Sequence, residues 1–219
     1  MNKDAKLRYD EGCLGAHALN AVGDRWAFLI LRELTFAPKR FGQLRAGMPR
    51  ITAAILSARL REMESAGIIA QGEDGYEMRR AGHAFLPVLQ ALCRFALLLP
   101  GHDPRRFISP SALMISMTSC ILPEAPAGLE GGFVMGDESF LLTTGQGALG
   151  VRAGGAEGAL FTLEGTANHL AAAVYGTAPI ALLEREGFLR CTGDREAAQR
   201  FTSFFSLIPQ DEHLQIGAR

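Results

Sequence analysis

The residues best suited to a chemical role are the positively charged side chains between positions 25 and 61. This stretch has eight Lys or Arg residues and one acidic residue, Glu33. Residues 1–100 carry fourteen Lys or Arg against ten Asp or Glu, and residues 101–219 carry eight against thirteen. A basic segment inside a nearly neutral chain predicts a polyanionic partner for one half only, although a solvated helical surface is the commoner reason for such a run. The cations are Arg25, Arg32, Lys39, Arg40, Arg45, Arg50, Arg59 and Arg61.

A series of short helices positions these charges. Capping residues and helix breakers, among them Asp24, Pro38 and Gly67, divide the first 67 residues into four helical segments. Each segment has apolar residues at helical spacing, which indicates one buried face. The predicted helices cover Leu14–Val22, Arg25–Leu34, Phe41–Ala46 and, after a Thr52 cap, residues 53–66.

The fourth helix has two different faces. Its apolar face is predicted to hold Ile55, Leu56, Leu60 and Met63. The opposite face is made of small and polar side chains, with Arg59 near the apolar boundary. This polar face contains Ala54, Ser57, Ala58, Arg61 and Ser65, and it is flanked by Ala53 and Glu62.

After the fourth helix, the spacing of the apolar residues changes from that of a helix to that of a strand. Residues 68–71 and 76–79 are short strand patterns, and Asp74-Gly75 between them supplies the positive φ angles of a tight hairpin. A helix is expected again from Gly82 to Leu98. This order predicts a winged helix-turn-helix with the fourth helix in the major groove of DNA.

The predicted DNA contacts follow from that geometry. Small residues let the helix approach the groove floor, and Thr52 directs the helix N-terminus toward phosphate. Arg61 can reach a phosphate or a guanine edge, whereas Arg59 is as well suited to clamp a neighbouring acid or carbonyl. The remaining contacts are expected from Lys39, Arg40 and Arg45 on the flanking phosphates and from Arg79 and Arg80 at the base of the wing.

Residues 13–96 resemble the HxlR-type winged helix regulators. The resemblance rests on Cys13, Ala18-Leu19 and the segments "GDRWAFLILREL", "RFGQLR", "ILSARLREMESAGII" and "LPVLQAL". It implies a homodimer on a partly symmetric operator. Two features depart from the family pattern: Ala53-Ala54 stand where a Lys or another polar residue is common, and the short wing has an acidic tip, Glu73-Asp74, which phosphate would repel.

The second half is predicted to be a separate α+β domain after a linker over residues 100–110. We expect a helix at residues 111–121, an antiparallel meander of four strands, two helices, a strand and a helix capped by Asp194. The strands of the meander are predicted at residues 132–135, 140–144, 148–152 and 159–163.

This end of the chain resembles the sterol carrier protein fold. The segments "ALFTLEGTANHLAAAVYG" and "GFLRCTGDREA" carry the resemblance. It implies an apolar cavity for lipid-like molecules between the sheet and the terminal helices, and such a cavity could hold an effector. The alternative is that the same side chains only fill the core. The candidates are Phe133, Phe140, Leu142, Phe161, Leu163 and Tyr175.

Other chemistry finds little support. The letters of a dinucleotide fingerprint at residues 145–150 lack a following helix, and the five histidines are scattered, so neither a cofactor nor a metal site is expected. No arrangement for nucleophilic or acid–base catalysis appears. The four widely spaced cysteines predict reduced thiols in the cytoplasm.

Cys13 leaves two readings open. It precedes a helix, whose dipole lowers a thiol pKa, and the family resemblance implies relatives that sense oxidants or electrophiles through a cysteine at this place. The plainer reading is a small apolar residue packed under the first helix.

We therefore predict a two-domain α+β regulator of transcription. Regulators of this class are most often repressors, and we expect the same here. Residues 1–99 would bind DNA and dimerise, and residues 111–219 would form the sterol-carrier-like domain. Residues 100–110 would link the two domains. Its expected partners are double-stranded DNA, a second copy and a small, apolar effector. The rival is a lipid- or metabolite-binding protein that uses its winged helix for dimerisation or protein contacts.

Overall fold

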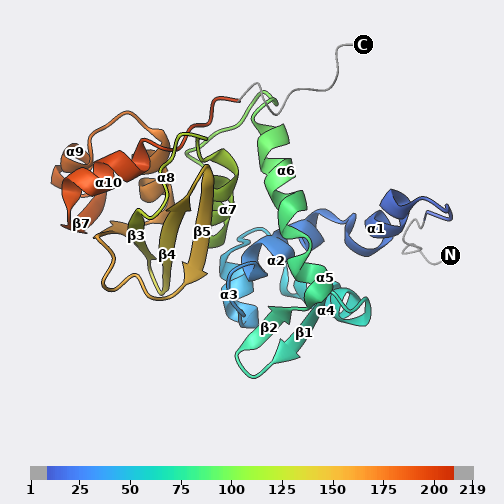
Figure 1. The fold of residues 1–219 in the computed structure, drawn as a ribbon. Helices are drawn as coiled ribbons and strands as arrows, with labels where there is room; N and C mark the ends of the chain where they lie inside the picture. Colours follow the sequence, from blue (N-terminus) through green and yellow to red (C-terminus); the bar gives the residue numbers. More distant parts are fainter. Residues whose placement is uncertain (1–8, 210–219) are drawn as a thin grey trace, which may run out of the picture. The chain divides into compact units, whose positions relative to one another are not determined.

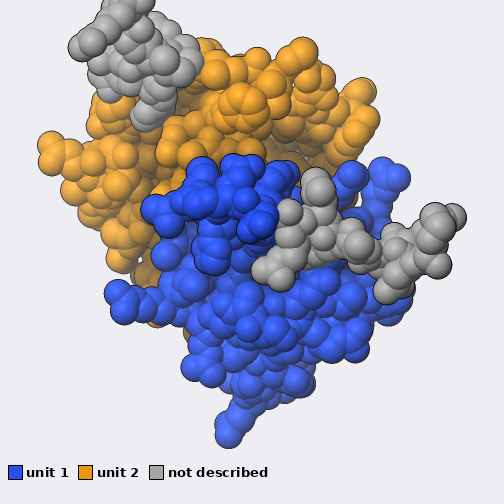
Figure 2. All heavy atoms as spheres, turned by 90° about the vertical axis from the view of Figure 1, so that its right-hand side faces the viewer, with its two compact units in different colours: residues 1–86 blue, residues 87–219 orange. Residues whose placement is uncertain are grey.

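The computed structural model describes residues 9–209. Its contacts divide the chain into two compact units, residues 1–86 (unit 1) and 87–219 (unit 2), coloured separately in Figure 2. The division falls at the start of the sixth helix, so that helix groups with unit 2. The domain limits expected from the sequence, at residues 99 and 111, stay a prediction.

Unit 1 is a helical domain with a two-stranded wing (Figure 1). The first three helices have the predicted bounds, and two predicted caps form: the Asp24 carboxylate accepts from the Trp26 N–H at 2.8 Å and the Thr52 hydroxyl accepts from the Ile55 N–H at 3.3 Å. The elements are α1 (Leu14–Val22), α2 (Arg25–Leu34), α3 (Phe41–Ala46), α4 (Ala53–Ser65), β1 (Ile69–Gly72), β2 (Gly75–Met78) and α5 (Arg80–His83).

Two details of unit 1 differ from expectation. The hairpin loop is Glu73-Asp74, since Gly72 pairs with Gly75, and the positive φ of 121° lies at Gly75 alone. The helix expected over residues 82–98 is instead two helices, α5 and α6 (Leu86–Ala96). Pro87 has no N–H to continue the helical hydrogen bonds across this junction, which explains the break.

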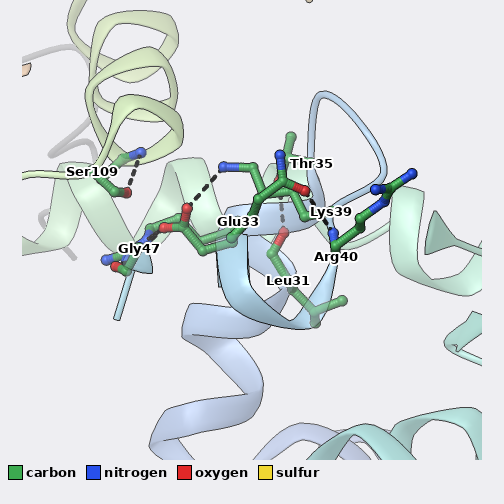
Figure 3. A network of polar contacts seen from close by, with 10 residues as sticks. Leu31, Glu33, Thr35, Lys39, Arg40, Gly47 and Ser109 are labelled. Carbon is green, nitrogen blue, oxygen red and sulfur yellow. Dashed lines mark hydrogen bonds and ion pairs between the residues drawn. The ribbon is translucent and has the colours of Figure 1, made fainter. Parts of the chain in front are cut away.

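A buried carboxylate holds the turn between α2 and α3 (Figure 3). Glu33 is fully buried, and it accepts from the Lys39 ammonium at 3.1 Å and from the Arg32 Nε at 2.9 Å. The Arg32 Nη2 also donates to the Gly47 carbonyl at 3.0 Å, at the end of α3. One network therefore fixes the last turn of α2, the following loop and the end of α3.

The same segment is joined to the wing through its backbone. Lys39 and Tyr76 exchange two N–H···O bonds of 3.0 and 2.9 Å, which adds a short bridge beside β2. Two glycines permit this packing. A side chain at Gly47 would collide with the Glu33 carboxylate, and one at Gly75 would collide with the Lys39 backbone.

Unit 2 contains a five-stranded mixed sheet with helices against it (Figure 1). The strand order is β5-β4-β3-β6-β7. Its elements are α6, α7 (Pro110–Cys120), β3 (Glu130–Met135), β4 (Glu138–Gly145), β5 (Ala148–Ala153), β6 (Phe161–Gly165), α8 (Ala167–Tyr175), α9 (Ile180–Arg185), β7 (Leu189–Gly193) and α10 (Arg195–Thr202).

The predicted four-strand meander is wrong in its last member. β3, β4 and β5 form an antiparallel meander, but β6 pairs parallel with β3 on its other edge. Residues 154–160 carry the chain back across the sheet, a crossover that alternation of apolar residues cannot reveal. Tertiary pairing therefore decided the topology here.

The core of unit 2 is aromatic. Phe161 and Phe201 pack edge to face with ring centroids 5.3 Å apart, and Phe133 lies 6.0 Å from Phe201. All three are fully buried. Phe201 thereby packs α10 on β6, and α8 lies against the same strand. No helix within residues 9–209 is long and apolar enough to cross a membrane.

The buried network predicts a large stability cost at Glu33. Glu33→Ala would leave the Lys39 ammonium buried without its carboxylate partner, so we expect the free energy of unfolding to fall by about 3–5 kcal/mol. Urea unfolding measures this. Glu73→Ala, at an exposed turn position, is the control and should change stability by no more than about 0.5 kcal/mol. Equal effects of the two variants would contradict a central role for Glu33.

Candidate nucleic-acid interface

The exposed face of α4 presents small side chains. Ala53 and Ala54 are exposed, and Ser57 and Ala58 are half-buried, while Leu60 on the other face is buried. Leu56 and Met63 are buried as predicted, but Ile55 is 37% exposed and does not belong to the core face. An exposed helix face without long side chains can approach another molecule closely.

Exposed cations flank this face. Arg40 is the N-cap residue of α3, Arg45 lies near the end of that helix, and Arg61 lies on α4 beyond the small residues. All three are exposed, and within residues 9–209 none of their guanidinium groups has an ion-pair partner. Unpaired, solvated cations are the groups that can release counterions on binding a polyanion.

Two other predicted contacts are engaged inside the protein. Lys39 is 4% exposed and ion-paired with Glu33. Arg59 is paired with Glu62, and its Nε lies 3.4 Å from the Asp24 carboxylate without hydrogen-bond geometry. Asp24 also caps α2, so Arg59 links α4 to the start of α2. The structure therefore gives Lys39 and Arg59 internal roles.

The wing has charges of both signs. Its tip, Glu73-Asp74, is exposed and acidic, and Arg79 and Arg80 are exposed at its base. Tyr76, on β2, is held against the Lys39 backbone. A polyanion would be repelled at the tip and attracted at the base.

Sequence reasoning missed one candidate cation. Arg50 was counted in the basic run but not given a role. The structure places it exposed, two residues before the Thr52 cap of α4. Its position immediately before the predicted reading helix was the signal that could have identified it.

The cysteines differ in surroundings. Cys13 is exposed at the N-cap of α1, so it is not packed beneath that helix. The backbone N–H groups of Ala16 and Gly15 favour its thiolate and lower its pKa. Cys120 is buried, and desolvation raises the pKa of its thiol to about 11. Cys13 is therefore the better nucleophile of the two.

The predicted pocket residues divide between core and cavity. Five of them are 0–2% exposed and pack in the core: Phe133, Phe140, Leu142, Phe161 and Leu163. Tyr175, in contrast, lines a cavity of about 710 Å³ within unit 2.

Comparison with known proteins assigns the family. The HxlR-like helix-turn-helix family model matches residues 21–99. An HTH-type transcriptional regulator of Methanothermobacter thermautotrophicus is 30% identical over 93 residues, which cover 39% of this chain and 71% of the relative. The chain belongs to the HxlR-like helix-turn-helix family. The matched residues contain α2 to α6, and so include the whole candidate interface of this HxlR-like chain.

Solved structures give further matches to parts of the chain. The quinone-bound YodB of B. subtilis is 31% identical and covers 36% of this chain and 91% of its own, with a TM-score of 0.35. A UbiJ-SCP2 ubiquinone synthesis protein is 19% identical and covers 55% of this chain and 92% of its own, with a TM-score of 0.33.

The cysteine environments predict an order of alkylation. At neutral pH iodoacetamide should modify Cys13 fastest and Cys120 slowest. A pKa near 11 instead of 9.0 leaves Cys120 with a thiolate fraction roughly a hundredfold smaller. Peptide mass spectrometry over a time course measures the rates. Raising the pH toward 11 should increase the alkylation rate of Cys120 by a larger factor than that of Cys13. Equal alkylation rates at neutral pH would contradict these assignments.

Proposed function

We propose that this HxlR-like chain is a DNA-binding transcriptional regulator, acting as a repressor, with α4 as the reading helix. The observation that carries the proposal is the exposed small-residue face of α4 with unpaired cations around it. Family membership gives independent support, because the relative from M. thermautotrophicus is named as an HTH-type transcriptional regulator.

The proposed contacts separate into positioning and reading. Arg40, Arg45 and Arg50 are exposed before α4 and would neutralise backbone phosphates. Ala53, Ala54, Ser57 and Ala58 let the helix backbone approach base edges, and the Thr52-capped N-terminus points partial positive charge at phosphate. Arg61 has the length to reach a guanine or a phosphate. Arg79 and Arg80 would contact DNA at the base of the wing.

Dimerisation is proposed through two exposed apolar surfaces. On α6, Val88, Leu92 and Phe95 are 44–54% exposed and repeat at a spacing of three and four residues. On α1, Leu14 and Leu19 are 85% and 47% exposed. A two-fold dimer through these helices would place two reading helices about 34–36 Å apart, one turn of DNA.

For unit 2 we propose a sterol-carrier-like fold that binds an apolar effector. The mixed sheet with helices packed on it, the sequence resemblance and the 710 Å³ cavity support this. The same cavity supports the second candidate, a lipid- or metabolite-binding protein whose winged helix serves dimerisation or protein contacts. The acidic wing tip is the feature of unit 1 that favours this rival.

Cys13 is proposed as a sensor of oxidants or electrophiles. Its exposure and the lowered pKa of its thiol support this role. The Cys13→Ser variant should then keep its DNA affinity in the presence of diamide, whereas the wild type should release DNA. Release by both proteins would remove the sensor role.

DNA binding by the proposed interface predicts distinct effects of its arginines. Arg45→Ala should weaken binding to every duplex about equally and lower the slope of log affinity against log salt by about 0.9, since one phosphate contact is lost. Arg61→Ala should cost about 1–3 kcal/mol if it contacts a base. Fluorescence anisotropy across a salt series measures both. Arg185→Ala, an exposed arginine on α9, is the control and should bind as wild type.

The dimer proposal predicts that a charge in the α6 stripe separates the subunits. Leu92→Glu should halve the molar mass in solution, because burying an uncompensated carboxylate at the interface is costly. It should also weaken DNA binding, since one subunit engages one half-site only. Multi-angle light scattering measures the mass. Leu182→Glu on α9, where the leucine is 36% exposed, should leave the mass unchanged. An unaltered dimer in Leu92→Glu would exclude this surface.

A further inference from the structure

The cavity of unit 2 lies outside the core of its sheet. It is bounded by α6, residues 97–108, α7 and α8, and small side chains make room for it. Its volume of about 710 Å³ falls in the range of about 300–1,000 Å³ that holds small molecules. The wall contains Ala96, Leu97, Ala112, Leu113, Ala171 and Ala172. The resemblance to sterol carriers implied a cavity against the sheet, but there the buried rings of Phe133, Phe161 and Phe201 fill the space.

The polar groups of the wall are uncharged where they are buried. The Ser116 and Tyr175 hydroxyls hydrogen-bond at 2.8 Å, and Cys93 and Cys120 lie on the same wall. Burial raises the pKa of Tyr175 well above its usual value and that of Cys120 to about 11, so both stay protonated at neutral pH. An ionised ligand group in this part of the cavity would have no opposite charge.

Among the described residues of the lining, the basic side chains are His102 and Arg105, and both are exposed. The side chain of Arg105 is 89% exposed and its guanidinium is bonded to the Asp103 carboxylate. Positive charge is thus confined to the outer segment of the wall. The interior favours an apolar molecule with an oxygen that bonds to the hydroxyl pair.

One side chain holds this outer segment in place. The Asn168 amide on α8 accepts from the Ile108 N–H at 3.1 Å and donates to the carbonyls of Pro104 at 3.3 Å and Arg106 at 2.7 Å. Residues 104–108 are thereby strapped to α8 by three hydrogen bonds to a single amide. This amide therefore holds the outer segment of the cavity wall against α8.

The helix α6 has one face in the cavity and another in solvent. Cys93, Ala96 and Leu97 line the cavity, whereas Val88, Leu92 and Phe95 are exposed on the other side of the helix. Gln90 on α6 donates to the Thr118 hydroxyl on α7 at 3.1 Å, which adds a polar contact between two of the walls. A molecule in the cavity therefore touches the helix that carries the proposed dimer stripe.

We propose that this cavity binds an uncharged, largely apolar molecule that hydrogen-bonds to the Ser116–Tyr175 pair, and that its occupancy repositions α6. The regulatory part rests on the proposed function, because it requires the α6 dimer and DNA binding. The binding part refines the effector site proposed for unit 2, but it requires neither the dimer nor DNA, so it can be tested on the full chain without DNA.

The test uses three pyrenes of one ring system with different substituents. 1-Hydroxypyrene is neutral at pH 7 and can bond to the hydroxyl pair, 1-methylpyrene cannot, and 1-pyrenecarboxylate is ionised. Pyrene fluorescence should report binding of 1-hydroxypyrene about tenfold tighter than 1-methylpyrene, the size of one net hydrogen bond, and weaker binding still of the carboxylate. Equal affinity for all three would overturn the assigned ligand class.

Variants locate the binding in the cavity. Ala172→Trp should fill the space from α8 and abolish binding of all three probes, and Ala112→Phe should do the same from α7. Ala181→Trp, an exposed helical alanine on α9 outside the cavity, should bind as wild type. The double change Ser116→Ala with Tyr175→Phe should remove the tenfold preference for 1-hydroxypyrene and leave 1-methylpyrene unaffected. Thermal unfolding shows whether each variant is folded.

The regulatory part has its own readout. Saturating 1-hydroxypyrene should change the dimer dissociation constant of the wild type at least fivefold and should not change that of Ala172→Trp. Probe binding with an unchanged dimer would overturn the link to α6 and keep the site. Binding that persists at full strength in both folded cavity-filling variants would overturn the site itself, whatever the DNA measurements show.

Discussion

The architecture of unit 1 depends on one carboxylate buried among cations. Glu33 lies in the last turn of α2, and its two oxygens hold Lys39 in the following loop and Arg32 beside it. Arg32 then reaches the end of α3, and the Lys39 backbone hydrogen-bonds to Tyr76 on β2 of the wing. Because a buried ion is costly without partners, this network tolerates few arrangements of its members. It therefore sets how α3 and β2 are placed, and through them the surface around α4.

The basic run serves two opposed purposes. Lys39 is ion-paired with Glu33, and Arg59 is ion-paired with Asp24 and Glu62. These two cations therefore stabilise the domain itself. Arg40, Arg45 and Arg61 remain solvated and unpaired among the described residues, so their attraction for a polyanion is undiminished. Charge counting along the chain cannot separate these groups. What separates them is burial, which follows from the packing of α2 against α3 and α4.

Local signals predicted most helices well. Asp24, Thr52 and Asp194 each cap a helix where a small polar side chain precedes an apolar pattern. The predictions were wrong where contacts between residues far apart in the sequence determine the structure. The parallel pairing of β6 with β3 and the internal role of Lys39 both depend on contacts between segments far apart in sequence or held by tertiary packing. An apolar cavity was expected between the sheet and the terminal helices, but its position among α6, α7 and α8 escaped prediction for the same reason, because alanines on these helices leave room only together.

Specific recognition of duplex DNA is the claim on which the regulator account rests. The direct measurement is fluorescence anisotropy of the full-length wild-type chain on duplex from upstream of its own gene and on a shuffled duplex of the same composition, at several salt concentrations. The account predicts much tighter binding to the first duplex and an affinity that falls steeply as salt rises. Weak, equal binding to both duplexes, with and without a ligand that occupies the cavity, would contradict it.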